Sequence, residues 1–169
     1  MKKTNPSFIL KIAEIVSTWF YVGRIRWAPG TWGTLATIPF VIMFQMMGSI
    51  AYMAVTFLII FLGIFLSDIY EKSNGDHDLP EIVIDEVAGY MIAMTLMPMT
   101  WQALTLGFLI FRFFDIFKPF PIGWLDRKID GGLGVMVDDV AAGVITNVIL
   151  QILYTKTAWL GSQIIHFNT

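Results

Sequence analysis

Several long apolar runs leave few folds open to this chain; they cover residues 35–47, 51–69, 82–97, 101–117 and 137–154. A helix needs about 20 apolar residues to cross the hydrocarbon core of a bilayer. Only 14% of the residues are charged, whereas soluble domains carry about 25%. The sequence therefore predicts an all-α, polytopic integral membrane helical bundle with about five membrane segments. The first segment is short and contains Pro39, so it either crosses or re-enters the membrane.

The N-terminal segment, residues 1–22, is predicted to form an amphipathic helix on the membrane surface. Its apolar residues recur at helical spacing: Phe8, Ile12, Ile15 and Trp19. The basic start is typical of a signal peptide, but Lys11 and Glu14 interrupt the apolar part and no small-residue cleavage site follows. We expect a single membrane-embedded domain over residues 1–169, in which this interfacial helix precedes a bundle over residues 23–155.

Lysine and arginine residues gather before the first run, after the second and after the fourth. They are Lys2, Lys3, Lys11, Arg24, Arg26, Lys72, Lys118, Arg127 and Lys128. Five crossings would place all of these segments on one side of the membrane, and an excess of positive charge marks the cytoplasmic side. The sequence therefore predicts a multi-pass protein whose longer polar segments face the cytoplasm.

Carboxylates converge on the same side of the predicted bundle, before and inside the third run, at the end of the fourth and at the start of the fifth. These acids are Asp76, Asp78, Glu81, Asp85, Glu86, Asp115, Asp126, Asp130, Asp138 and Asp139. Ionisable groups at membrane depth are candidates for a functional site. Because the chain has no cysteine and only two histidines, clustered carboxylates indicate a hard cation such as Mg²⁺.

Helix capping is the simpler explanation for part of this cluster. Asp85, Asp138 and Asp139 lie near predicted helix starts, where a carboxylate accepts free backbone N–H groups. Capping does not explain Asp115, which lies among phenylalanines near a helix C-terminus, where the helix dipole disfavours an anion. Arg112, three residues earlier, would lie on the same helix face and is a candidate partner. A cation site and a set of caps with one local ion pair both remain open.

Groups that suit a phosphate accompany the acids. The stretch APGTWGT, residues 28–34, contains Gly30, Thr31, Gly33 and Thr34. Backbone N–H groups in a glycine-containing loop, or at a helix N-terminus, bind phosphate oxygens, although a plain Pro-Gly turn is the alternative. The candidate cations for the same phosphate are Arg112, Lys118 and Arg127. Aromatic residues over 117–124 are typical of an interfacial anchor, and a site at headgroup depth would suit a lipid substrate.

Four blocks of sequence carry a family resemblance in their residues, order and spacing. The blocks are APGTWGTLATIPF (28–40), HDLPEIVIDEVAGY (77–90), FRFFDIFKPFPIGWLDR (111–127) and GGLGVMVDDVAAGV (131–144). Over residues 23–154 the chain resembles the phosphatidylglycerophosphatase A family of bacterial membrane enzymes. The resemblance implies a Mg²⁺-dependent phosphoric monoester hydrolase of the bacterial cytoplasmic (inner) membrane. Its substrate would be phosphatidylglycerophosphate, and its products phosphatidylglycerol and inorganic phosphate.

The resemblance also implies roles for residues of the bundle, which we expect to be catalytic. The implied catalytic residues are Asp85, Glu86, Asp115, Asp126, Asp138 and Asp139, and all of these except Asp126 are implied metal ligands. Attack on phosphorus by a carboxylate, through a phospho-aspartyl intermediate, and attack by a water that the cation activates are both open. Asp126 would protonate the leaving glycerol oxygen, or orient Arg127 or a water.

Other functional classes fit the sequence less well. A histidine-nucleophile lipid phosphatase needs two suitably placed histidines, and only His77 lies near the acids. The Asp-Gly…Ala-Arg…Gly…Asp…Asp pattern of CDP-alcohol phosphotransferases is absent, and a net charge of −2 gives no indication of nucleic-acid binding. A cation transporter predicts acids on both sides of the membrane midplane rather than at one surface. The alternative functions are such a transporter or another Mg²⁺-dependent lipid phosphate phosphatase. The sequence also leaves assembly into a homo-oligomer open.

Overall fold

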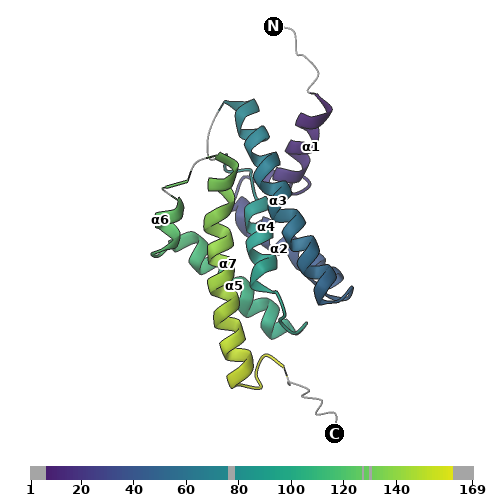
Figure 1. Ribbon diagram of the computed structural model, residues 1–169, viewed down its shortest axis with the longest axis vertical. Coiled ribbons are helices and arrows are strands. Elements are labelled where there is room, and N and C mark those ends of the chain that lie inside the picture. Colours follow the sequence, from purple (N-terminus) through teal and green to yellow (C-terminus); the bar gives the residue numbers. More distant parts are fainter. Residues whose placement is uncertain (1–6, 76–78, 127, 130, 162–169) are drawn as a thin grey trace.

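The computed structural model describes residues 7–75, 79–126, 128–129 and 131–161, and within these ranges it is helical with no strand. Figure 1 shows the arrangement of the helices. They are α1 (Phe8–Ser17), the short 3-10 helix η1 (Val22–Arg24), α2 (Pro29–Gln45), α3 (Ser49–Asn74), α4 (Ile84–Ala93), α5 (Trp101–Phe117), α6 (Ile122–Asp126) and α7 (Gly131–Lys156). The predicted all-α class is confirmed.

The helices differ in whether they are long enough to cross a membrane. α3 and α7 have 26 residues each and are the two described helices that are both long and apolar enough to cross. α2 and α5 have 17 residues each, which is about 26 Å at 1.5 Å per residue. α4 has only 10 residues, about half the thickness of the hydrocarbon core. The structure therefore supports two membrane-crossing helices and does not confirm the predicted count of about five membrane segments.

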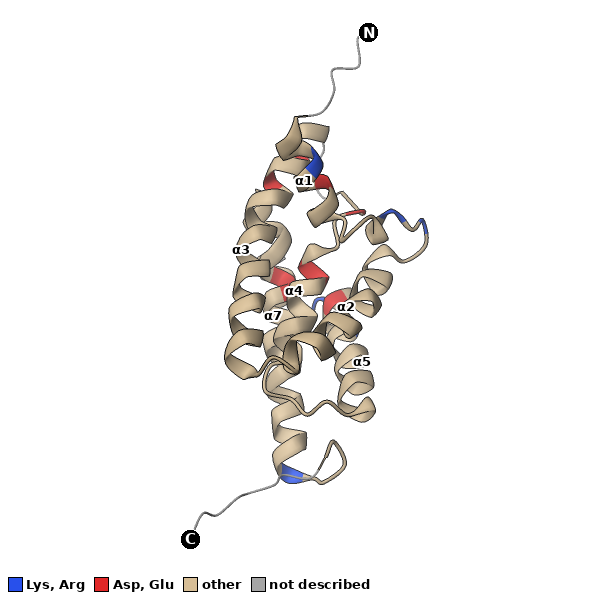
Figure 2. Cartoon of the chain, turned by 90° about the vertical axis from the view of Figure 1, so that its right-hand side faces the viewer, with Lys and Arg blue, Asp and Glu red and all other residues tan. Residues whose placement is uncertain are grey.

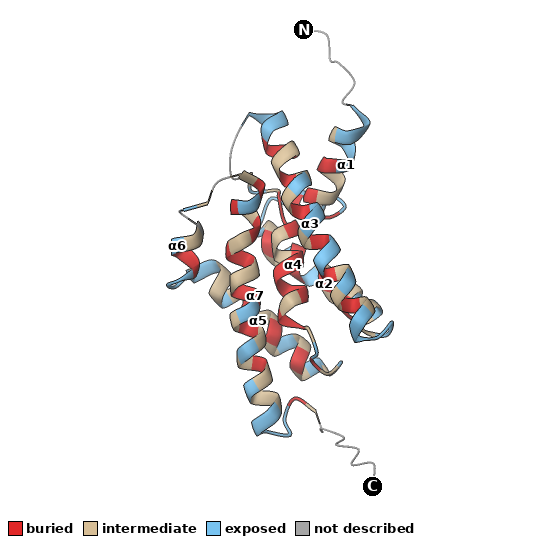
Figure 3. Cartoon of the chain, in the orientation of Figure 1, coloured by how far each residue is buried: buried red, intermediate tan, exposed pale blue. Residues whose placement is uncertain are grey.

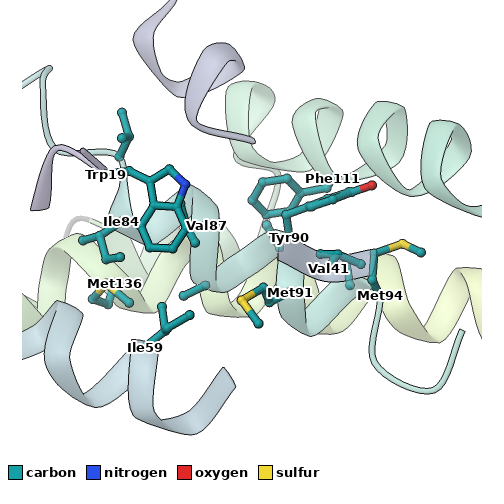
Figure 4. Close-up of a cluster of buried hydrophobic side chains, with 14 of the residues drawn as sticks. Trp19, Val41, Ile59, Ile84, Val87, Tyr90, Met91, Met94, Phe111 and Met136 are labelled. Carbon is teal, nitrogen blue, oxygen red and sulfur yellow. The ribbon is translucent and has the colours of Figure 1, made fainter. Parts of the chain in front are cut away.

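The short helix α4 lies at the centre of the bundle, and α2, α3, α5 and α7 pack around it. It is buried along most of its length (Figure 3) because its sequence after Asp85 and Glu86 in the first turn is apolar on all sides, which is the pattern of an enclosed helix. Figure 4 shows side chains of α4 among residues from the surrounding helices. The labelled residues of this core include Val41, Ile59, Ile84, Val87, Tyr90, Met91, Phe111 and Met136.

Two glycines allow α4 and α7 to touch through their backbones. A Cβ atom added to Gly89 of α4 would lie 2.6 Å from the backbone oxygen of Asp139 on α7, and a Cβ added to Gly143 would overlap the carbonyl oxygen of Gly89. Only glycine permits so close an approach. The crossing therefore places Asp139 directly beside α4.

Side chains from three helices complete the hydrogen bonding where α4 ends inside the bundle. The last carbonyls of a helix have no partner within it, and inside a membrane water does not replace that partner. The bonds run from Tyr52 Oη to Met91 O (2.7 Å), from Gln45 Nε2 to Met94 O (2.9 Å), and from Asn147 Nδ2 to Ala93 O (2.9 Å) and Thr95 O (2.8 Å). α4 is thereby held at a fixed depth between α2, α3 and α7.

Several helix boundaries differ from those predicted. α2 begins at Pro29 rather than near residue 35, because proline is favoured in the first turn of a helix. α7 begins at Gly131 rather than near residue 137, and α6 lies between the predicted fourth and fifth apolar runs, 101–117 and 137–154. α1 is a helix as predicted, but Trp19 lies beyond its end with φ +45° and is buried, with its ring 5.0 Å from that of Phe40. Trp19 is thus a core residue and not part of an amphipathic helix face.

Candidate active site

A cavity of about 170 Å³ lies where the first turns of α2 and α4 meet the end of α5 and the second turn of α7. Its lining combines acidic, basic and apolar residues: Pro29, Gly30, Leu79, Pro80, Ile82, Asp85, Glu86, Asp115, Lys118, Val135, Asp138 and Asp139. Figure 2 shows acidic positions in red gathered near α2 and α4. The structure thus brings together all five predicted metal-binding acids, from three helices.

Three of these acids form a tight group. Asp85, Glu86 and Asp139 each offer a carboxylate oxygen, and the three oxygens lie within 4.8 Å of one another. Oxygen ligands at about 2.1 Å from an octahedral Mg²⁺ are at most about 4.2 Å apart, so a small inward movement would bring this group to the ligand geometry of Mg²⁺. Like-charge repulsion among the three carboxylates is otherwise unfavourable.

Two buried oxygen atoms in this group have unused bonding capacity. Asp139 is only 2% exposed, and its Oδ1 has no hydrogen-bond partner in the part of the chain that the structure describes; the same holds for Glu86 Oε2. A buried carboxylate oxygen without a partner is costly. A divalent cation would satisfy both atoms, so the residues present fit Mg²⁺.

The other two acids are paired with basic side chains. Asp115 forms an ion pair with Arg112 one turn earlier on α5, as the sequence suggested. Asp138 Oδ2 lies 2.6 Å from Lys118 Nζ. The five acids therefore comprise a group of three and two paired acids, and Arg112 links the two sets because it also lies 3.5 Å from Glu86 Oε1.

The capping explanation fails for the acids of α7. Because α7 begins at Gly131, Asp138 and Asp139 lie two turns inside the helix, where backbone N–H groups are already bonded. The explanation holds in part for Asp85, whose Oδ1 accepts the backbone N–H of Glu86 at 3.0 Å in the first turn of α4.

The predicted phosphate-binding glycines and threonines are separated by the helical form of their segment. Gly30 lines the cavity, and a Cβ added to it would overlap Glu86 Oε1. Thr34 and Gly33 face the bundle interior instead: the Thr34 hydroxyl donates to Gly30 O, and Gly33 packs against Val83. The N–H of Thr31 is bonded to Ala28 O at 3.0 Å. Of these four residues, only Gly30 lines the described cavity.

Of the predicted phosphate-binding cations, Lys118 and Arg112 differ in how far they are exposed to the cavity. Lys118 caps the C-terminus of α5, has a 34% exposed side chain and lines the cavity. The Arg112 side chain is only 13% exposed, contacts Glu86 and Asp115, and is not part of the described cavity lining. Asp126 is the last residue of α6, but its side chain lies outside what the structure describes, as do Arg127 and His77.

Sequence reasoning missed the segment that leads into α4. Leu79, Pro80 and Ile82 line the cavity. They belong to the same family block as Asp85, residues 77–90, and this position in the sequence could have indicated that they lie at the site. Glu81 accepts a hydrogen bond from the Tyr70 hydroxyl and lies 3.9 Å from Arg24 Nε.

The sequence assigned Arg24 no catalytic role and counted it only toward the charge that marks the cytoplasmic side, yet it links three parts of the fold. It also pairs with Glu14 of α1, so α1, η1 and the segment before α4 are joined. A hydrogen bond with Tyr70, together with the Glu14 and Glu81 carboxylates, raises the pKa of Arg24 above its usual value. This network holds the wall of the cavity that precedes Asp85.

Comparison with known proteins identifies the family. The profile of the family "Phosphatidylglycerophosphatase A" matches residues 15–154. Phosphatidylglycerophosphatase A of Escherichia coli is 38% identical over 154 residues, which are 90% of this chain and 86% of the relative. The Haemophilus influenzae protein of the same name is 38% identical over 155 residues, 89% of this chain and 95% of the relative.

A third relative carries another name. A Bacteroides thetaiotaomicron protein, provisionally named a phosphatidylinositol-3-phosphatase, is 31% identical over 157 residues, 88% of this chain and 95% of its own length. No solved structure matches the chain significantly. The family profile covers the helices that form the cavity, and the first two relatives agree with it over most of their length. The chain therefore belongs to the phosphatidylglycerophosphatase A family.

Proposed function

We propose that this protein hydrolyses the terminal phosphate monoester of phosphatidylglycerophosphate to give phosphatidylglycerol and inorganic phosphate. The reaction would require Mg²⁺ and take place at the cytoplasmic face of a bacterial inner membrane. Family membership supports the substrate. The single observation that carries the chemistry is the group of three carboxylates beside a lysine in one cavity, with two buried oxygens that have no hydrogen-bond partner among the described residues.

The depth of the cavity supports a lipid substrate. α3 and α7 run antiparallel (Figure 1), and 20 helical residues span about 30 Å, the thickness of the hydrocarbon core. Counted from the C-terminal end of α7 at Lys156, this length reaches Met136, within a turn of Asp138 and Asp139. The cavity would then lie at headgroup depth, so that the acyl chains stay in the bilayer while the phosphate reaches the carboxylates.

The proposed orientation rests on charge. Lys72 lies in the last turn of α3, and Lys118 caps α5 and lines the cavity, whereas Lys156 lies in the last turn of α7. Figure 2 shows lysine and arginine positions, in blue, toward the α1 end of the molecule and at the C-terminal end of α7. The positive-inside rule places the cavity end in the cytoplasm. α2 and the pair α4–α5 would complete a multi-pass bundle around the crossing helices α3 and α7.

The side chains of the site divide the work of the reaction. Asp85, Glu86 and Asp139 would hold the cation, which when bound supplies Lewis-acid polarisation of the phosphoryl group. Lys118, at the mouth of the cavity, would bind phosphate oxygens and stabilise their charge in the transition state. In the net reaction water supplies the oxygen that joins phosphorus and gives up one proton, the bond between phosphorus and the glycerol oxygen breaks, and the glycerol oxygen takes up one proton as phosphate leaves.

The proposal is tested by phosphate release from phosphatidylglycerophosphate in detergent, with Mg²⁺ or with EDTA, for the wild type, Asp139→Asn and Asp68→Asn. We expect release by the wild type with Mg²⁺ only, a loss of at least 100-fold in Asp139→Asn, and near wild-type release in Asp68→Asn, whose acid lies outside the cavity. Phosphatidic acid and phosphatidylinositol 3-phosphate, tested alongside, measure the preference for the substrate. Wild-type protein that releases no phosphate with any divalent cation would refute the proposal.

A further inference from the structure

We infer that Arg112 is a positioning residue: it acts on the reaction through Glu86 and Asp115 and does not itself contact the lipid phosphate. The inference rests on the proposed function. It assigns different roles to the two basic residues near the acids: Arg112 orders the site, and Lys118 contacts the substrate. It departs from the sequence prediction, in which Arg112 and Lys118 had the same role.

The first observation is that one nitrogen atom of Arg112 joins two helices. Its Nη1 forms the ion pair with Asp115 Oδ2 on α5 and lies 3.5 Å from Glu86 Oε1 on α4. A guanidinium group is planar and permanently charged, so it fixes the carboxylates it contacts more strictly than an ammonium group does. Arg112 therefore sets the position of Glu86 relative to α5.

The second observation concerns the two carboxylate oxygens of Glu86, because Arg112 contacts only one of them. Arg112 faces Oε1, whereas Oε2 is buried without a hydrogen-bond partner among the described residues. Oε2 is thus the oxygen left for a cation. Partners that orient metal ligands in this way typically change metal affinity by about 10- to 100-fold.

The third observation is that Arg112 is enclosed between α5 and the first turn of α2, with a side chain only 13% exposed. A Cβ added to Gly30 of α2 would lie 3.0 Å from Arg112 Nη1, and it would overlap Glu86 Oε1. Arg112 is not among the residues that line the cavity, while Lys118, on the same helix, is. A phosphate in the cavity would therefore meet Lys118 and the carboxylates, with Arg112 behind them.

The test compares Arg112→Met, Arg112→Lys and Lys118→Met by Mn²⁺ binding in the absence of lipid. Free Mn²⁺, measured by electron paramagnetic resonance on detergent-solubilised protein, reports affinity without reference to catalysis. We expect Arg112→Met to weaken Mn²⁺ binding about 10- to 100-fold, Arg112→Lys to weaken it less because the charge is kept, and Lys118→Met to leave it unchanged. If Arg112→Met does not fold, Arg112→Lys still gives the comparison.

Steady-state kinetics at saturating metal supply the second readout. We expect Arg112→Lys to lower kcat with an unchanged KM for phosphatidylglycerophosphate, and Lys118→Met to raise KM. Wild-type Mn²⁺ affinity together with a raised KM in both Arg112 variants would overturn the inference, because it would place Arg112 on the phosphate. A third outcome separates the two claims: the Arg112 variants bind Mn²⁺ more weakly than the wild type, but the wild type itself releases no phosphate. That outcome would support the positioning role and refute the proposed function.

Discussion

Replacement of Gly89 by alanine tests whether the crossing of α4 and α7 sets the geometry of the site. The added Cβ would lie 2.6 Å from both the backbone oxygen of Asp139 and Cε2 of Phe111. Ordinary van der Waals contact begins at 3.4 Å, so the two helices must separate by about 0.8 Å. A backbone oxygen has no rotamer through which to move aside, and the displacement therefore falls on the helices themselves.

The expected effects on stability and activity differ in size. Alanine favours the helix by about 1 kcal/mol relative to glycine, whereas overpacking of a core costs about 1–3 kcal/mol. The free energy of unfolding should therefore fall by no more than about 2 kcal/mol. Activity should fall much further, because Asp139 moves away from Asp85 and Glu86, and a misplacement of about 1 Å can cost about 100-fold in rate.

The assay measures thermal unfolding in detergent and phosphate release on the same preparations. The control is Val144→Ala, which changes a 48% exposed side chain of α7 that does not line the cavity; it should leave both quantities near wild type. A Gly89→Ala protein that unfolds at the wild-type temperature and releases phosphate at the wild-type rate would refute the proposed link between the crossing and the site.

Two further substitutions test the cap of α4 and the start of α2. Asn147→Leu should lower the free energy of unfolding in detergent by about 1–2 kcal/mol, because it removes the hydrogen bonds to the Ala93 and Thr95 carbonyls inside the bundle; unchanged stability would contradict the capping role. Gly30→Ala should weaken Mn²⁺ binding at least 10-fold, because the added Cβ displaces the Glu86 carboxylate; wild-type affinity would show that Glu86 is not a ligand.

Each of these substitutions has a control on the same helix. Val148→Leu lies next to Asn147 on α7 and changes an exposed side chain, so unfolding should be unaffected. Leu35→Ala lies on α2 at an exposed position outside the cavity, so Mn²⁺ affinity should be unaffected.

The acidic cluster could be predicted from the sequence because its members mark the ends of apolar runs. Hydropathy gives the approximate depth of Asp85, Glu86 and Asp139, and depth alone suffices to bring helix ends of the same side together. Hydropathy does not show which of the five acids form the group of three, because that depends on how the ends of α4, α5 and α7 pack and on which oxygens Arg112 and Lys118 reach.

The start of α2 was misplaced because its sequence supports two structures. Pro29 and Gly30 are typical of a turn, and they are equally compatible with the first turn of a helix. The outcome depends on α4: Gly30 and Gly33 have no side chains, and their backbones pack against Glu86 and Val83. Local propensity contains no information about that partner, so the helix was predicted to begin only near residue 35.

The short length of α4 connects the interior of the bundle with the chemistry at its surface. A full-length buried helix would end at the opposite surface, where water satisfies its last carbonyls, but α4 ends after 10 residues and relies on side chains such as Asn147. Asn147 lies on α7 eight residues after Asp139, about 12 Å along the same helix. The hydrogen bonds that satisfy the end of α4 therefore also fix its height against α7, and that height decides whether Asp85 and Glu86 lie level with Asp139. Polar residues deep in the bundle thus set the register of a site at its surface, without touching the cavity.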